Sequence, residues 1–556
     1  MSAGRPRSAW YIMALATCLL SCGGETKPPL RTGVVATLSS CEQVELSETV
    51  GHPGPWLETS NTVFGLTTNQ QGALQFQAPS VARERTFVIR SLTDGSELSV
   101  VVKASEAADS IGLAPGCAPF EYGVASGDPT GSGVLLWTRA QVDAPLTWRL
   151  STKPDFSVTT QSGQVTPTAE RDHTVTVSVA DLKPDTVYFY RFETADGQAS
   201  AAGRTRTAGA LSDQTLRFAL VSCSSLFSGY FTGYAHIAAR DDINLVIHLG
   251  DYIYDFVDKD EEIRIPTPAP TEPDDLASHR ARHALYLLDP DLRAARGAHP
   301  WFVLWDNHDL EYSKPPDYEG GARAFREWVP MAEGVTESQV YRRLDYGELA
   351  SVWLVDALLH KKENKLPGSE EMDMLGAKQW AWLSAELTNS VATWKVIGNQ
   401  KLFSPFQAPV SQGGSTWKAY PESRERLLQW LKNETSGNSL FISGDAHFTV
   451  FSNLLDNSKS AISVELLGAS LTRGNVDETI SGGPDVFGPL TDAFMQLNPH
   501  FADVNLFDHG YGLVEVTAEQ ATAQMLYFPI LKPGGEVTEG PVWTVEAGAP
   551  QWRAKK

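Results

Sequence analysis

Basic residues are few in this sequence compared with acidic ones. Its 556 residues include 45 lysines and arginines against 67 aspartates and glutamates, which gives a formal net charge of -22. Such an acidic surface repels phosphate backbones, so we expect no binding to a nucleic-acid duplex. The composition, 42% hydrophobic and 20% charged, is that of a globular protein, and the length favours two to four domains.

The N-terminal hydrophobic run is too short to span a bilayer. Arg5 and Arg7 precede the apolar residues 9–20, an arrangement that is typical of a signal peptide for export. The triplet "ALA" at residues 14–16 would allow ordinary cleavage, but it lies deep within the apolar run. We therefore expect an exported protein.

The residues that follow this run resemble a bacterial lipobox. The ending "LLSC", Leu19–Cys22, predicts that residues 1–21 are removed and that Cys22 carries a lipid. Residues 22–32, which include "GGETKPP", would form a flexible tether to the membrane. The expected location is the cell envelope, and we expect a monomer.

Cysteine is scarce, with five residues in the chain. Cys18 lies in the signal peptide, and Cys22 would carry the lipid. Cys41 and Cys117 bracket a small N-terminal segment and could form a disulfide in an oxidising compartment. Cys223 is left over, and a lone thiol in an exported protein is open to oxidation unless a group such as a metal ion holds it.

Alternating apolar and polar residues indicate two β-rich units in the first part of the chain. Residues 33–117, with runs such as "TFVIRSL" and "LSVVVKA", predict a small β module that carries no catalytic constellation. Residues 120–208 have alternating runs at the spacing of a β-sandwich. Their "LKPDTVYFYRF" is typical of a fibronectin type III-like domain, in which Tyr188 or Tyr190 would be a packing residue.

Beyond Leu216, short apolar runs alternate with helix-like stretches. The runs "LRFALVSCSS", "INLVIHLGD", "WFVLWDNHD", "WKVIGNQ" and "LFISGDAHF" each end in polar residues, and stretches such as "GAKQWAWLSAEL" and "SRERLLQWLK" lie between them. This alternation predicts an α/β domain with buried sheets over residues 216–528 and a C-terminal tail over 529–556. Ligands of such folds bind at the carboxyl ends of the strands.

Several strand ends carry side chains that could bind metal ions. A single aspartate there is more often a helix cap, and a single buried cysteine is usually inert. Carboxylates, an amide and imidazoles that converge on one rim, however, need cations to offset their burial. A thiolate and a phenolate together suit a strongly Lewis-acidic ion such as iron(III). The candidates are Cys223; Asp251 and Tyr254; Asp306, Asn307, His308 and Asp309; and Asp445 and His447.

The blocks of sequence around these residues resemble those of a known enzyme family. "HLGDYIYD", "WDNHD" and "SGDAH" are similar to blocks of the calcineurin-like metallophosphoesterases. "FEYGVASGDPTGSGVLLWTRA", "ALVSCSS", "AKQWAWL" and "WKVIGNQ" narrow the resemblance to the alkaline phosphatase D (PhoD-like) family, over about residues 120–516. The resemblance implies a β-sandwich domain followed by a four-layer α/β/β/α metallophosphatase domain.

The resemblance also implies two metal ions, iron(III) and calcium, although other divalent metals would suit some of the ligands. One set of residues would bind the iron, with its aspartate bridging to the second ion, and another set would bind the calcium. The iron set is Cys223, Asp251, Tyr254 and His447, and the calcium set is Asn307 and Asp445.

The same resemblance assigns His308 to stabilise the phosphorus centre and to protonate the leaving oxygen. Asp309 could orient His308, whereas Asp306 could be an outer ligand or a strand cap. Asp255 would cap the residues after it.

The chain departs from the family pattern at several positions. "WDNHD" replaces the usual "WDDHE", and Tyr312 stands where an asparagine often follows the histidine. Leu358 in "VDALLH" takes the place of the arginine of a D-T-R motif, which could alter specificity. Possible replacements for that arginine are His360, Lys361 and Arg473, although a solvated position is the alternative for each.

The predicted function is hydrolysis of phosphate monoesters or diesters by a metal-bound hydroxide at the cell envelope. One alternative is a phosphodiesterase or phospholipase D-like enzyme specific for lipid or cell-wall phosphodiesters, which the lipid anchor and Leu358 favour. The other is a surface-binding lipoprotein without activity, which the presence of all the motif residues together opposes.

Overall fold

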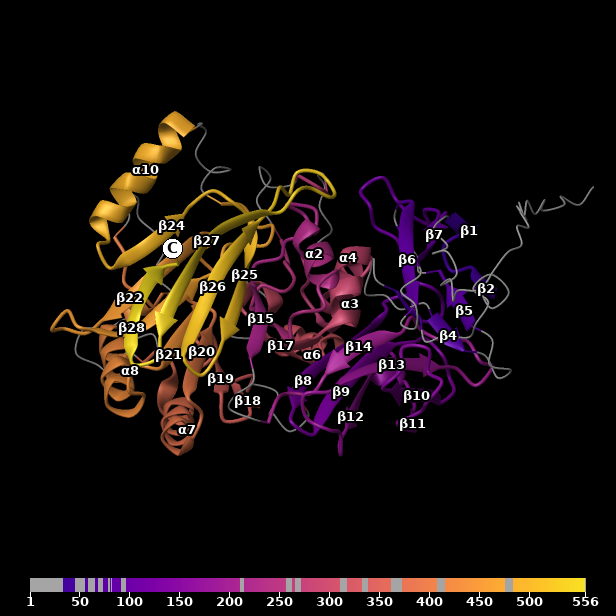
Figure 1. Ribbon diagram of the computed structural model, residues 1–556, viewed down its shortest axis with the longest axis horizontal. Helices are drawn as coiled ribbons and strands as arrows, with labels where there is room; N and C mark the ends of the chain where they lie inside the picture. The colour runs from indigo at the N-terminus through magenta and orange to yellow at the C-terminus, as the bar shows by residue number, and fades with distance from the viewer. Residues whose placement is uncertain are drawn as a thin grey trace, which may run out of the picture.

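The computed structural model describes residues 34–45, 56–58, 66–68, 74–78, 81, 83–91, 97–210, 215–256, 263–265, 272–310, 318–332, 339–361, 373–407, 416–475 and 484–555. The expected signal peptide, lipidated Cys22 and tether lie outside these ranges, as does Tyr312. Within them, no helix is both long and apolar enough to cross a membrane. The described chain is elongated, with the first β-rich unit at one end and the C-terminal strands at the other (Figure 1).

The first β-rich unit contains two small sheets. The predicted bond between Cys41 and Cys117 is confirmed, and it closes a separation of 76 residues. Such a link stabilises a fold by about 2–4 kcal/mol, largely by restricting the unfolded chain. In sheet order the strands are β1 (Val34–Leu38), β7 (Glu97–Val102), β6 (Arg85–Ser91) and β3 (Trp56–Glu58), and β2 (Gln43–Glu45), β5 (Leu74–Gln77) and β4 (Leu66–Thr68).

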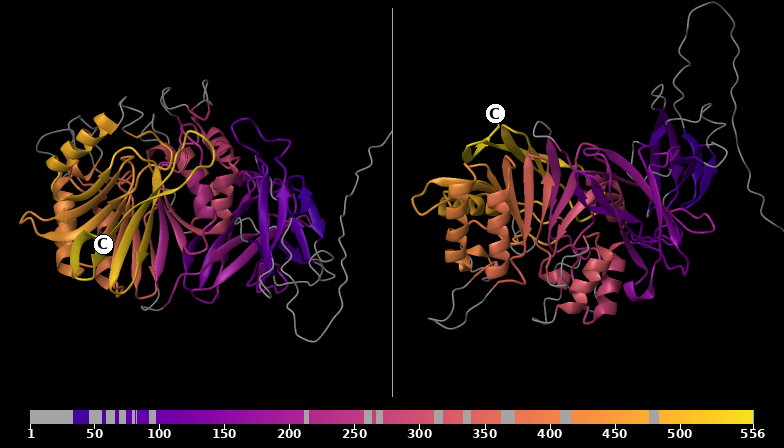
Figure 2. Two further views of the ribbon diagram at one scale, coloured as in Figure 1. Left: turned by 45° about the horizontal axis from the view of Figure 1, so that its top comes forward. Right: turned by 90° about the horizontal axis from the view of Figure 1, so that it is seen from below.

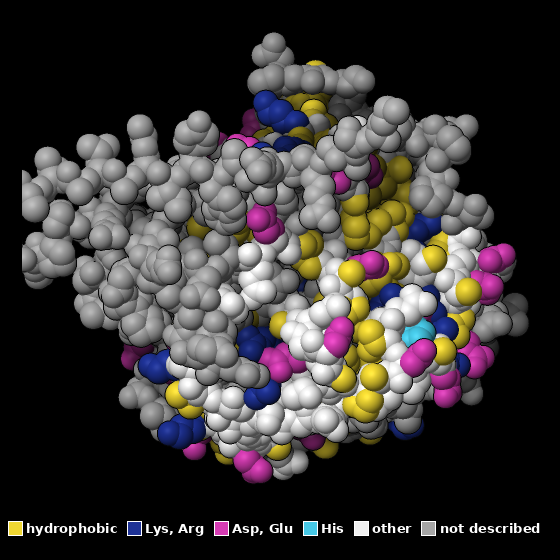
Figure 3. All heavy atoms as spheres, turned by 90° about the vertical axis from the view of Figure 1, so that its right-hand side faces the viewer, with side chains coloured by type: hydrophobic (Ala, Val, Ile, Leu, Met, Phe, Trp, Pro, Cys, Tyr) yellow, Lys and Arg dark blue, Asp and Glu magenta, His cyan; other side chains and the backbone are white. Residues whose placement is uncertain are grey.

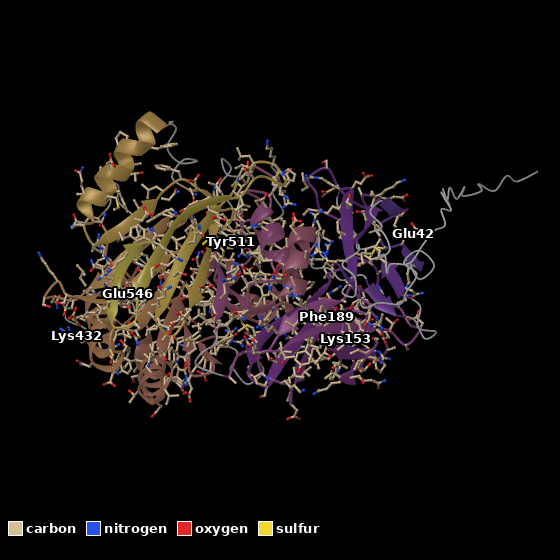
Figure 4. The ribbon with its side chains drawn as sticks, in the orientation of Figure 1. Glu42, Lys153, Phe189, Lys432, Tyr511 and Glu546 are labelled. Atoms are coloured by element: carbon tan, nitrogen blue, oxygen red, sulfur yellow. A yellow bond between two sulfur atoms is a disulfide. The ribbon has the colours of Figure 1, made fainter. Side chains whose placement is uncertain are left out.

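This unit forms the end of the molecule farthest from the C-terminal strands. Glu42 in the first unit and Glu546 near the C-terminus lie well apart along the long axis (Figure 4). Acidic and basic side chains are interspersed on the described part of this end (Figure 3). The local charge there is mixed, although the chain as a whole is acidic.

The central sheet has ten strands and joins two of the expected domains. In sheet order it contains β12 (Thr174–Val179), β9 (Gly133–Arg139), β8 (Val124–Thr130), β17 (Pro300–Leu304), β16 (Leu245–Leu249), β15 (Leu216–Val221), β25 (Gly510–Val516), β26 (Gln520–Tyr527), β27 (Thr538–Glu546) and β28 (Ala549–Ala554). Strand β8 pairs with β17 in parallel, with Pro300 opposite Ser126. The ladder therefore runs without a break from the unit expected over 120–208 into the α/β part.

A second sheet packs against the β12-β9-β8 end of the central sheet. Tyr188 and Tyr190 are buried between them, and the hydroxyl of Tyr188 accepts a hydrogen bond of 3.0 Å from the amide of Lys183. Both tyrosines are therefore packing residues, as predicted. This sheet contains β11 (Gln161–Val165), β10 (Leu146–Ser151), β13 (Val187–Glu193) and β14 (Gly203–Arg206).

The residues after 528 are not a tail. Strands β27 and β28 extend the central sheet, and Trp552 of β28 donates its indole N–H to the carbonyl of Glu465 at 3.1 Å. The sequence did not predict these two strands. Most residues of β27 are half-exposed or exposed, and the strand lacks a clear alternation of apolar and polar residues.

A seven-stranded sheet faces the central one, and α7 (Gly376–Asn389) and α8 (Pro421–Glu434) cover its outer side (Figure 2). Leu383 and Leu387 of α7 and Leu427 and Leu431 of α8 pack on the buried residues of these strands. In sheet order the strands are β18 (Arg342–Tyr346), β19 (Ala350–Val355), β20 (Trp394–Asn399), β21 (Ser439–Ser443), β23 (Ala461–Leu467), β22 (Thr449–Leu455) and β24 (Phe501–Asn505).

Helices α7 and α8 lie at the two helix-like stretches "GAKQWAWLSAEL" and "SRERLLQWLK" named from the sequence. Helix α4 begins at Pro290, where a proline suits the first turn, and the Asp289 carboxylate accepts hydrogen bonds from the amides of Asp291 and Leu292. The α-helices are α2 (Thr232–Ala238), α3 (Leu276–Tyr286), α4 (Pro290–Ala298), α5 (Asn307–Leu310), α6 (Glu319–Trp328), α7 (Gly376–Asn389), α8 (Pro421–Glu434) and α10 (Pro484–Leu497).

The two large sheets are packed closely against each other. A Cβ added at Gly398 of β20 would lie 3.1 Å from Cδ2 of Leu249 in β16. Strands β15, β16 and β17 are mutually parallel, as are β19, β20, β21 and β23. The carboxyl ends of each set therefore lie at one edge of their sheet, and the predicted site residues follow these ends.

Candidate metal centre and active site

Each candidate side chain is delivered by the residues that follow a parallel strand. Cys223 follows β15, Asp251 follows β16 and Asn307 follows β17 in the central sheet. Lys401 follows β20 and Asp445 follows β21 in the seven-stranded sheet. The site therefore lies between the sheets, with side chains from both.

Four of the site residues adopt the left-handed backbone conformation. The φ angles are 56° at Cys223, 52° at Asp251, 71° at Asp445 and 64° at His447. This conformation costs about 1–3 kcal/mol at a residue other than glycine, and it persists where the surroundings fix it. Here the amide of Cys223 donates to the carbonyl of Gly250 at 3.1 Å, which ties the two strand ends together.

Three of the predicted iron ligands converge with a tyrosine at their side. A ligand atom from each of Cys223, Asp251 and His447 lies within 4.8 Å of the others. The Tyr254 hydroxyl donates to Asp251 Oδ2 at 3.1 Å and lies 3.5 Å from His447 Nε2. His447 Nδ1 is 3.0 Å from the carbonyl of Gly474, so Nδ1 carries the proton and Nε2 offers its lone pair to the cluster.

The electrostatics of this cluster favour a bound cation. Burial, with the Asp251 carboxylate nearby, raises the pKa of both the Cys223 thiol and the Tyr254 phenol well above their ordinary values. Burial lowers the pKa of His447, which keeps its imidazole neutral. A metal ion reverses the effect on the thiol and the phenol, and it is ligated by neutral imidazole. The four side chains therefore fit a metal ion of strong Lewis acidity.

The residues expected to bind calcium contact an ammonium group instead. Lys401 Nζ donates to Asp445 Oδ1 at 2.5 Å, to Asp306 Oδ2 at 2.7 Å and to Asn307 Oδ1 at 3.2 Å. Burial would lower the pKa of Lys401, but the carboxylates of Asp306 and Asp445 outweigh it and raise that pKa above the ordinary value. A calcium ion does not fit here beside the charged side chain.

Lys401 was not among the residues predicted from the sequence. The sequence did contain a feature that pointed to it, because this lysine directly follows "WKVIGNQ", one of the runs that end at the predicted rim. Asp306, expected to be an outer ligand or a strand cap, has a buried side chain whose Oδ2 pairs with Lys401.

His308 lies beside the cluster and is held by Asp255. Its Nδ1 is 2.5 Å from Asp255 Oδ1, and its ring centroid is 4.2 Å from that of Tyr254. Its backbone amide donates to Asp251 Oδ1 at 3.3 Å. Burial lowers the pKa of His308, but the carboxylates of Asp251 and Asp255 outweigh burial, and the pKa is raised overall. The imidazole is thereby suited to donate a proton.

The expectation that Asp309 orients His308 is corrected by these contacts. The Asp309 carboxylate accepts hydrogen bonds from the amides of Ile253 at 3.0 Å and Asp306 at 2.8 Å. Asp309 therefore fixes the turns after β16 and β17 to each other. Asp255 accepts a hydrogen bond from the amide of Phe256 at 3.0 Å, as expected of a cap, and it also provides the side-chain contact to His308.

One of the three possible replacements for the missing arginine lies at the cluster. The Arg473 guanidinium is 5.6 Å from the centroid of the Tyr254 ring. His360, by contrast, lies with Nε2 3.8 Å from Asp356 Oδ2, and Lys361 follows it in the chain. Leu358, at the family's arginine position, is buried.

Comparison with known proteins identifies the family. Residues 218–525 match the family described as PhoD-like phosphatase, and residues 105–209 match the PhoD-like phosphatase N-terminal domain. The chain belongs to the PhoD-like phosphatase family. This PhoD-like phosphatase is 30% identical over 501 residues to alkaline phosphatase D of Bacillus subtilis (strain 168), which covers 80% of this chain and 84% of that protein.

A solved structure agrees with this assignment. The structure described as "Structure of PhoD" superposes with a TM-score of 0.70 at 27% identity, over 79% of this chain and 92% of that chain. This PhoD-like phosphatase is therefore a hydrolase of phosphoric esters, and its family implies metal dependence. The alternative of a binding lipoprotein without activity is set aside.

Proposed function

We propose that this phosphatase hydrolyses phosphate monoesters and diesters at an iron(III) centre bound by Cys223, Asp251, Tyr254 and His447. The observation that carries the proposal is the convergence of thiol, carboxylate and imidazole ligand atoms within 4.8 Å of one another, with a phenol beside them. When bound, such an ion supplies Lewis acidity and activates water for attack on phosphorus.

The protein's own residues contribute binding and proton transfer. Arg473 is suited to the non-bridging oxygens of the phosphoryl group, because a guanidinium pairs with phosphate through two parallel hydrogen bonds. His308, with its raised pKa, donates a proton to the leaving oxygen. Asp255 keeps the imidazole in one orientation through the Nδ1 contact of 2.5 Å.

We expect the iron-loaded enzyme to hydrolyse both p-nitrophenyl phosphate and bis-p-nitrophenyl phosphate. The measurement is kcat/KM for each substrate, before and after removal of metal by a chelator. Turnover of both substrates that is lost on chelation and restored by iron supports the proposal. No turnover of either substrate by iron-loaded enzyme would refute it.

A phosphodiesterase that acts on lipid or cell-wall phosphodiesters is the second candidate. The feature that favours it is Leu358, which provides no positive charge where the family has an arginine. A phosphate monoester carries two negative charges and would lack one cationic side chain to pair with, whereas a diester carries only one negative charge. Turnover of the diester alone in the same assay would select this candidate.

The proposed location is the cell envelope, with the protein anchored through a lipid on Cys22. The support is the sequence alone, in which Arg5 and Arg7 precede a short apolar run that ends in "LLSC". We expect wild-type protein in the membrane fraction and the Cys22→Ala variant in the soluble or unprocessed fraction. Equal distribution of the two would contradict a lipid anchor.

We also propose the finer architecture that the family resemblance implied. The packing of α7 and α8 on the seven-stranded sheet supports an α/β/β/α order of layers. The two sheets that enclose Tyr188 and Tyr190 support a fibronectin type III-like sandwich.

A further inference from the structure

Lys401 has an ammonium group whose three protons are matched by three oxygens. The side chain is 2% exposed, and Nζ contacts Asp306 Oδ2, Asn307 Oδ1 and Asp445 Oδ1 at 2.7, 3.2 and 2.5 Å. An ammonium has three donors and no lone pair, so these contacts use its full capacity. The acceptors include both residues that the family resemblance assigns to the second ion.

We propose that the Lys401 ammonium replaces a second metal ion, so that this phosphatase works with a single resident ion. The inference rests on the proposed metal centre. An ion coordinated by Asn307 and Asp445 would use the same Oδ1 atom of Asn307 to which Lys401 donates, and it would share the Asp445 carboxylate with Lys401. It would also place its charge directly beside a buried ammonium, and the two cations would repel each other.

The backbone around Lys401 holds the side chain in this position. The Lys401 amide donates to Asn399 Oδ1 at 3.0 Å, and the side chain of Gln400 donates to the carbonyl of Trp305 at 2.8 Å. The turn after β20 is thus bound to the end of β17, from which Asp306 and Asn307 also project. An ion that took these three oxygens would have to displace the charged side chain of Lys401.

The charges at the site explain why a cation is needed at this point. Asp251, Asp306 and Asp445 bring three carboxylates to one rim, and buried carboxylates need paired positive charge. Lys401 supplies that charge permanently, whereas a bound ion depends on its concentration. Because all three of its donors are used, Lys401 is a positioning residue that holds Asp306, Asn307 and Asp445 in place. The contacts to the substrate phosphate come from the single ion and from Arg473.

The test is a count of metal ions per chain in the full-length protein. Wild type, Lys401→Ala and a control variant are loaded with iron, dialysed against calcium and analysed for both elements. The control is Lys395→Ala, because Lys395 also lies in a buried part of the same β20 segment but donates to the carbonyl of Ala392 instead of a carboxylate. Thermal unfolding with and without calcium is measured on the same samples.

We expect wild type and Lys395→Ala to hold about one iron and no calcium, with a Tm that calcium does not change. Lys401→Ala frees three oxygen ligands, so we expect it to gain up to one calcium per chain and a Tm that rises with calcium. Calcium bound to wild type at one ion per chain would overturn the inference. So would a folded Lys401→Ala variant that binds no calcium.

The result stays interpretable if a variant fails or if the proposed function is wrong. If Lys401→Ala does not fold, the calcium content of wild type still decides the question. If wild type binds no iron, the proposed centre is refuted, whereas gain of calcium by Lys401→Ala still supports replacement of the second ion. Neither readout requires a substrate.

Discussion

The Cys223→Ala variant is expected to lose its iron and, with it, phosphatase activity by on the order of 100-fold or more. Loss of a residue that only supports a ligand already costs about 10–100-fold in metal affinity or activity, and Cys223 would be a ligand itself. Its side chain is buried, with Sγ 3.8 Å from Asp251 Oδ2, so its removal takes a ligand atom from the centre of the cluster. Elemental analysis and kcat/KM on the same preparation check the prediction.

The double variant Cys41→Ser/Cys117→Ser is the matched control for loss of cysteine. Its disulfide lies in the first β-rich unit, so its iron content should equal that of wild type. Retention of iron by folded Cys223→Ala would show that the thiolate is not a ligand. Binding of zinc or manganese alone, unaffected by the substitution, would leave the metallophosphatase fold intact but refute the iron–thiolate centre.

Replacement of His308 by asparagine is expected to lower kcat by on the order of 10²–10⁴-fold without loss of metal. The imidazole would protonate the leaving oxygen, so its loss should matter most when the leaving group is a poor one. We expect a larger decrease with phenyl phosphate than with p-nitrophenyl phosphate, because p-nitrophenolate departs without full protonation. An equal decrease with both substrates would contradict the role of His308 as general acid.

The Asp255→Asn variant tests the contact that holds His308. The Asp255 carboxylate raises the pKa of His308, so a neutral amide should lower it. The acid form of His308 is lost as the pH rises through its pKa, and the basic limb of the kcat profile should therefore move to lower pH. Asp309→Asn is the control, because Asp309 binds backbone amides, and this variant should lose stability without moving that limb.

Most of the candidate site residues could be named from the sequence because they directly follow short apolar runs that are typical of buried strands. Apolar runs that end in Cys223, Asp251 and Asp445 predict parallel strands, and parallel strands bring their carboxyl ends together. The pattern does not determine where a side chain points after the strand ends. The contact to His308 was for that reason expected from Asp309, whereas Asp255 makes it, since the turns decide which carboxylate reaches His308.

Contacts between residues far apart in the chain were the other feature that could not be predicted from the sequence. Lys401 meets Asp306 and Asp445 only because two separate sheets pack face to face. Strand β8 pairs with β17, which lies more than a hundred residues later in the chain, and no local pattern indicates that partner. The disulfide between Cys41 and Cys117 was predictable because elimination left few other pairs.

The parallel pairing of β8 with β17 has a consequence for how the chain can be divided. A fragment that starts at Leu216 would leave one side of β17 with unpaired amides and carbonyls along an apolar, fully buried strand. Such an open edge is a template for aggregation. The two regions matched to the family are thus halves of a single folding unit, and neither is expected to survive proteolytic separation from the other.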